Sequence, residues 1–191
     1  MKTRFSYSVF VLILAFFVHS CAEKQEWSGD SYINYPDMEM IVEENIKPMQ
    51  ASSKSFRQIV KEGDKQDTIY VKSGEVNWQT VNELFTKSTL FNKDLDKQYT
   101  IDVLTDTVHS IMSVVYTSLN AELPVKLLTI KSSIDDRKIS SVYVELTEDH
   151  LGGFENHKLL FVRNKSLQMQ LHSKKPLKDD LYVTTTWTCL N

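Results

Sequence analysis

Apolar residues recur at the spacing of an α-helix between residues 36 and 61. One stripe of this segment consists of Met38, Ile41, Val42, Ile46 and Met49. We predict a helix here, and we expect Pro48 to kink or split it because the proline ring removes a backbone donor. A second helical piece is predicted through Phe56, Ile59 and Val60, with its end at Gly63.

Two shorter segments precede a change of period. Residues 68–72 (TIYVK) are a short β-like run. Asn77 is a residue type that caps helices, and the helix predicted after it carries one apolar stripe of Trp78, Val81, Leu84 and Phe85. We expect this helix to end between residues 88 and 92.

From residue 99 onward, β-like runs alternate with polar turns. The seven runs are 99–105, 108–119, 125–132, 138–147, 157–163, 167–172 and 181–188. Alternation is clear where Leu167, Met169 and Leu171 are interleaved with polar residues. The links are too short for crossover helices, so the strands should form an antiparallel meander.

This order of elements predicts an α+β fold in which N-terminal helices pack on a curved antiparallel β-sheet of about seven strands. Some runs break the simple alternation, among them Leu127-Leu128 and residues 159–162 (LLFV). They place apolar side chains on both faces of neighbouring strands. Either both faces are covered or one face lines an apolar cavity, and the sequence leaves these alternatives open.

The N-terminus has the three parts of a secretory signal. Lys2 and Arg4 precede an unbroken apolar run at residues 9–18, which is too short to span a bilayer. A polar stretch follows Cys21. We therefore divide the chain into a signal peptide at 1–20, a flexible tether at 21–36 and a single α+β domain at 37–191.

The residues before Cys21 resemble the lipobox of bacterial lipoproteins. Val18 and Ser20 fit the aliphatic and small positions of that motif, whereas His19 departs from it. The resemblance implies that the Cys21 thiol receives lipid and becomes the first residue after cleavage. Because Ala22 and not an aspartate follows Cys21, it also implies an outer-membrane lipoprotein of the cell envelope, facing the periplasm or the cell surface.

The charge balance excludes one large class of partner. Loss of Lys2 and Arg4 takes the 22 basic residues to 20 against 25 acidic ones, so the net charge changes from −3 to −5. There is no long basic run. The chain therefore lacks the electrostatic footprint of nucleic-acid binding.

Candidate catalytic chemistry is weak throughout the sequence. Glu148, Asp149, His150, Glu155 and His157 surround a Gly152-Gly153 turn and could hold a divalent ion, but a solvated hairpin tip is the simpler interpretation. No G-x-S-x-G turn, P-loop or dinucleotide fingerprint occurs. We predict no enzyme, no cofactor and no metal site.

Two functions fit these observations. The favoured one is a non-enzymatic protein-interaction or structural module that presents a surface to another envelope protein. The alternative is a carrier of a lipid or acyl chain held between the sheet and the helices, an architecture that resembles periplasmic lipoprotein carriers. The candidate lining residues for such a ligand are Leu128, Val144, Phe161, Met169 and Trp187.

Overall fold

The computed structural model describes residues 38–90, 98–174 and 181–189. All the described residues belong to one compact unit, Tyr35–Asn191. The proposed signal peptide, the tether at 21–36 and the lipid site at Cys21 lie outside the described residues.

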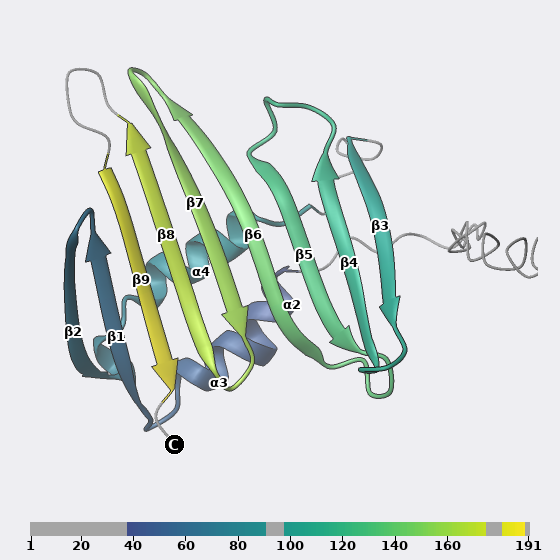
Figure 1. The fold of residues 1–191 in the computed structure, drawn as a ribbon, viewed down its shortest axis with the longest axis horizontal. Helices are drawn as coiled ribbons and strands as arrows, with labels where there is room; N and C mark the ends of the chain where they lie inside the picture. The colour runs from purple at the N-terminus through teal and green to yellow at the C-terminus, as the bar shows by residue number, and fades with distance from the viewer. Residues whose placement is uncertain (1–37, 91–97, 175–180, 190–191) are drawn as a thin grey trace, which may run out of the picture. The chain divides into compact units, whose positions relative to one another are not determined.

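The first helical segment consists of α2 (Met38–Ile41), η2 (Val42–Ile46) and α3 (Lys47–Gln50) (Figure 1). Its predicted apolar stripe is confirmed, since all five stripe residues are buried. The η2 turn is a π-helix in which the Lys47 N–H donates to the Val42 carbonyl, five residues back. This wider turn lies directly before Pro48, which cannot donate to the carbonyl four residues back. The proline therefore coincides with a local change of helix type.

The predicted second helical piece is wrong, because its residues form a strand. β1 (Ser55–Glu62) and β2 (Lys65–Lys72) make a hairpin whose turn contains Gly63 at a φ of 56°. β1 also pairs along its length with the last strand, with Phe56 opposite Cys189. The spacing of Phe56, Ile59 and Val60 fits one face of a helix, but hydrogen bonding to two neighbouring strands decides the conformation.

A short 3-10 turn, η3 (Ser73–Glu75), leads to α4 (Trp78–Lys87). The predicted cap and stripe are both confirmed. The Asn77 side chain accepts a hydrogen bond from the Thr80 N–H at 3.3 Å, and the four stripe residues are buried. Beside this helix, the Trp78 indole N–H donates to the Ser73 carbonyl at 2.7 Å, and the Ser73 hydroxyl donates to the Gln50 carbonyl at 2.5 Å. These bonds join α4 to the end of α3.

The antiparallel meander is confirmed. Its strands are β3 (Tyr99–Asp106), β4 (Ile111–Ser118), β5 (Val125–Ser133), β6 (Ile139–His150), β7 (Gly153–Val162), β8 (Ser166–Lys174) and β9 (Leu181–Cys189). The sheet has nine strands rather than seven, because the β1–β2 hairpin adds to β9. Its order is β2-β1-β9-β8-β7-β6-β5-β4-β3. The fold is thus α+β, dominated by one antiparallel sheet (Figure 1).

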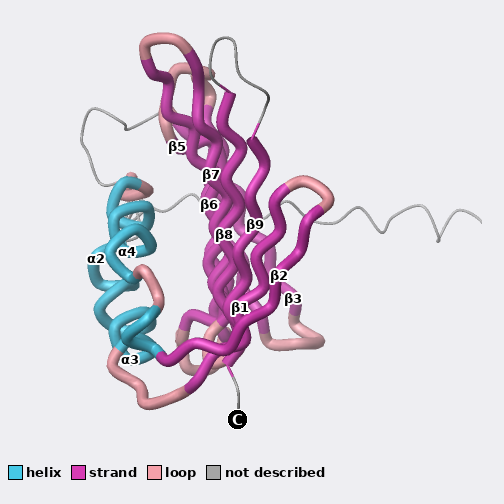
Figure 2. The backbone as a smooth tube through the Cα atoms, turned by 90° about the vertical axis from the view of Figure 1, so that its left-hand side faces the viewer, coloured by secondary structure: helices cyan, strands magenta, loops and turns pink. Residues whose placement is uncertain are grey.

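The strand register assigns each side chain to one of two faces of the sheet. The helix face is the one that carries Phe56, whose ring meets the Trp78 ring of α4 edge-on with centroids 6.0 Å apart. By register it also carries Leu128, Val144, Phe161 and Trp187. We call the opposite side the outer face; it carries Glu145, Lys158, Gln168, Gln170, Thr184 and Thr186. Figure 2 shows α2, α3 and α4 on one side of the strands.

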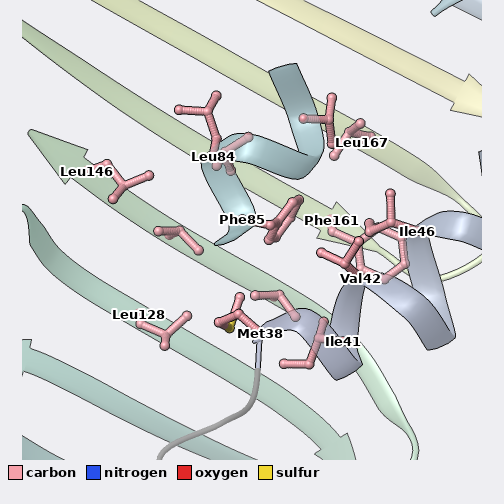
Figure 3. Packing of buried hydrophobic residues seen from close by; sticks show 14 of the residues in the cluster. Met38, Ile41, Val42, Ile46, Leu84, Phe85, Leu128, Leu146, Phe161 and Leu167 are labelled. Atoms are coloured by element: carbon pink, nitrogen blue, oxygen red, sulfur yellow. The ribbon is translucent and has the colours of Figure 1, made fainter. Parts of the chain in front are cut away.

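A single cluster of buried apolar side chains combines helical and strand residues. Leu84 and Phe85 of α4 belong to the same cluster as Leu146, Phe161 and Leu167 (Figure 3). Phe56, Phe85, Leu128, Leu159 and Leu167 are fully buried, at 0% exposure. Burial on this scale is the main favourable contribution to folding.

We expect Phe56→Ala to lower the free energy of unfolding by about 3–5 kcal/mol, because it removes a fully buried ring and leaves a cavity. Urea denaturation followed by circular dichroism measures the change. The control is Tyr70→Ala in the paired strand β2, where the side chain is 70% exposed and the change should stay within about 0.5 kcal/mol. Equal losses in the two variants would contradict the position of β1 in the core.

Candidate functional site

A shallow groove of about 370 Å³ lies on the outer face of β7, β8 and β9. Its side-chain lining comes from two rows of the sheet, in which Asn156, His172 and Tyr182 are in register, as are Lys158, Gln170 and Thr184. Leu171 and Val183 complete the lining; their side chains point to the helix face, so they contribute through the backbone. The groove therefore presents amide, hydroxyl, ammonium and aromatic groups on a lining that also has apolar surface.

An aromatic stack forms one end of the groove. The His172 and Tyr182 rings are parallel within 9°, with centroids 4.1 Å apart. The Phe154 ring meets His172 edge-on, with a centroid distance of 5.1 Å. Tyr182 is 55% exposed. The stack thus offers a supported aromatic surface to solvent.

A network of hydrogen bonds lies beside the groove and fixes its charge. The Lys158 ammonium is 3.0 Å from Glu145 Oε1, and the Tyr143 hydroxyl donates to the same carboxylate oxygen. Burial opposes ionisation of Glu145, but the bonds from Tyr143 and Lys158 outweigh it and hold the pKa of Glu145 below its usual value. Burial and the Glu145 carboxylate raise the pKa of Tyr143 to about 12. At neutral pH, Tyr143 is therefore a hydrogen-bond donor and no base.

A second polar cluster lies on the helix face, at the end of α4. The Lys87 ammonium is 2.7 Å from Glu148 Oε1, and this hydrogen bond holds the pKa of Glu148 below its usual value. His150 Nε2 and His157 Nε2 lie 4.0 Å and 3.6 Å from Glu155 Oε2. Burial lowers the pKa of His157, although Glu148 and Glu155 act in the opposite direction.

These residues include four of the five named above as a conceivable cation site. The structure brings them to one hairpin, β6–β7, where Lys87 forms an ion pair with Glu148 and the rings of His150 and His157 lie close to Glu155. Within residues 38–90, 98–174 and 181–189, no three His, Cys, Asp or Glu side chains are arranged to hold a metal ion. The cluster is an electrostatic link between α4 and the sheet.

The five residues proposed to line an apolar ligand all lie on the helix face. Leu128, Val144, Phe161 and Trp187 are buried within the core cluster, and Met169 is partly buried against it. None of the five lines the groove or the smaller pocket of about 150 Å³ at the β6–β7 turn. Cys189, at the end of β9, is a free cysteine whose thiol has its pKa raised by burial.

The residues of the groove and its network were not predicted from the sequence. Polar residues are interleaved with Leu167, Met169 and Leu171, and this alternation is the signal that the polar positions share a face. The alignment of Gln170 with Lys158 and Thr184 depends on the register of three strands, which no local pattern contains. Local alternation identifies a polar face, whereas register identifies a site.

Comparisons with known proteins found no match, so the description of the site rests on its geometry. No protein-family model, curated protein or solved structure matches this chain. Among the described residues, no helix combines the length and apolar character needed to cross a membrane.

The surroundings of His157 give a prediction with two opposite signs. We expect Glu148→Gln to lower the pKa of His157 further, because a nearby negative charge is lost, and Lys87→Met to raise it, because a nearby positive charge is lost. NMR titration of the imidazole signals measures both changes. Lys138→Met, which removes the pair with Asp136 on another turn, should leave the titration of His157 unchanged.

Shifts of the same sign in both variants would refute this assignment of charges around His157.

The lowered pKa of His157 also has a consequence for stability. Folding lowers the pKa of His157 below its ordinary 6.5, so the unfolded chain binds more protons as the pH falls through this range. The contribution of His157 to stability is therefore present above pH 6.5 and is lost as the pH falls toward the folded-state pKa.

Proposed function

We propose that this chain is a lipid-anchored protein of the bacterial cell envelope that serves as a non-enzymatic interaction or structural module. The first part of the proposal rests on the sequence before Cys21, which resembles a lipoprotein signal. A chain with two or more acyl groups at its N-terminus stays on its membrane, because each buried CH₂ contributes roughly 0.8 kcal/mol. The outer membrane is the proposed location.

One observation carries the second part of the proposal, namely the difference between the two faces of the sheet. The helix face is filled by its own apolar side chains and those of α2, η2, α3 and α4. The outer face carries polar side chains such as Gln168, Gln170 and Thr186, and no described helix covers it (Figure 2). A protein of this design interacts through its outer face.

The carrier alternative has less support. It needs a space between the helices and a curved sheet, but the residues proposed to line that space are packed in the core. An acyl chain would have to displace Leu128 or Phe161, which are almost fully buried, from a core that, as in protein interiors generally, is close-packed. We therefore favour the interaction module.

Lipid attachment has a direct test. We expect radiolabelled palmitate to be incorporated into the chain in a bacterial host and to be absent from Cys21→Ser. Cys189→Ser is the matched control, since it removes the other cysteine and should keep the label. Label that survives Cys21→Ser, or a wild-type chain without label, would overturn the proposed anchor.

The working face can be tested by site-specific photo-cross-linking in the same host. A photoreactive residue in place of Thr186, central on the outer face, should give discrete cross-linked products. The same residue in place of Gln79, exposed on α4, should give none, because the helical side is proposed to be free of partners.

Products that form at Gln79 and are absent at Thr186 would refute the assignment of the outer face. Lipid extraction and mass spectrometry of protein purified without its anchor address the carrier alternative. Co-purified lipid at one molecule per chain would replace the proposed function with that alternative, and a lipid-free protein would remove it.

A further inference from the structure

We infer that the outer-face groove binds a neutral saccharide of one or two sugar rings. This inference names a class of ligand for the outer face and so rests on the proposal that this face is the working surface. It follows from which groups the groove offers, from their charge and from the size of the space.

The backbone beneath the groove is already paired within the sheet. β7, β8 and β9 are interior strands, and each pairs with a neighbour on both sides. Their main-chain donors and acceptors are therefore engaged in the sheet, so a partner cannot be added here as an extra strand. Hydrogen bonds to a ligand in the groove must therefore come from side chains.

Polar side chains of the groove can both donate and accept hydrogen bonds. Asn156, Gln170 and Thr184 present two amides and a hydroxyl, groups that both donate and accept hydrogen bonds. Within the described part of the chain, the side chains of Gln170 and Thr184 form no hydrogen bond to another residue. Groups of this kind, a few ångströms apart on one surface, match a ligand that carries several hydroxyls on a rigid ring.

The groove also has an exposed aromatic surface. The Tyr182 ring is 55% exposed and lies parallel to His172, so its orientation is supported from below. The face of an aromatic ring is electron-rich and attracts the weakly positive C–H groups of a sugar ring. Polar recognition at the ring edge and stacking at its face distinguish a saccharide from a simple polar solute.

The charge of the groove lining and the volume of the groove favour a small neutral ligand. Lys158 is the ammonium group of the lining, and Glu145 neutralises it at 3.0 Å. An anionic ligand would have to compete with that carboxylate, whereas a neutral one would not. The groove volume of about 370 Å³ is near the lower limit of ligand pockets, roughly 300–1,000 Å³. It suits one or two rings rather than a long chain.

Saturation-transfer difference NMR on the full chain tests the inference, with cellobiose, maltose, lactose and chitobiose as probes. We expect saturable binding of at least one probe at millimolar concentration, with the strongest transfer to ring C–H protons. Tyr182→Ala and Gln170→Ala should each weaken the affinity by at least about tenfold. Tyr70→Ala and Gln66→Ala, which alter exposed outer-face residues of β2 away from the groove, should change it less than about twofold.

Three results would overturn the inference. They are the absence of binding by all four disaccharides, affinity that is unchanged in both groove variants, and binding of glucose 6-phosphate when glucose itself does not bind. Circular dichroism of each variant tests whether it is folded. If Tyr182→Ala does not fold, Gln170→Ala still tests the inference. Cross-linking at Thr186 without saccharide binding would refute this inference alone, whereas saccharide binding without a cross-link would refute the proposed protein partner.

Discussion

The pairing of β1 with β9 is the interaction on which the rest of the structure depends. It joins the β1–β2 hairpin to the last strand and so completes the nine-stranded sheet. It also places Phe56 against Trp78, which positions α4 over the sheet. Closing so long a loop has an entropic cost that grows only slowly with length. The apolar contacts that the closure assembles, from Phe56 across to Leu128, offset it.

The sequence predicted those elements whose pattern is local. The seven strands of the meander, the capped helix after Asn77 and the buried stripe from Met38 to Met49 follow from period, turn residues and capping. The strand at Phe56 was missed because Phe56, Ile59 and Val60 satisfy a helical spacing as well as they satisfy a strand. Pairing with β2 and with the distant β9 resolves that ambiguity. The groove was missed for a related reason, since Lys158, Gln170 and Thr184 come from three strands whose register no local pattern contains.

The two faces of the sheet differ in burial and in the side chains that they carry. On the helix face, residues such as Val144 and Leu159 lose all contact with water and contribute stability. On the outer face, half-buried amides and hydroxyls contribute little to the core but define what the surface can recognise. The apolar runs place side chains on both faces, so the outer face also carries apolar residues such as Leu127, opposite Glu145. In β7, Leu159 and Phe161 enter the core, while Leu160 pairs with Gln168 on the outer face.

Strand β7 shows how closely two different electrostatic environments can be placed. His157 and Lys158 are adjacent in sequence, yet they point to opposite faces. Burial lowers the pKa of His157, although Glu148 and Glu155 lie nearby and act in the opposite direction. Lys158 is held by Glu145, and Tyr143, with a pKa of about 12, stays protonated there. The outer-face network therefore keeps its charge near neutral pH, while the link between α4 and the sheet can respond to acid. Alternation along one strand therefore separates a pH-responsive contact on the helix face from a network on the outer face whose charge is constant near neutral pH.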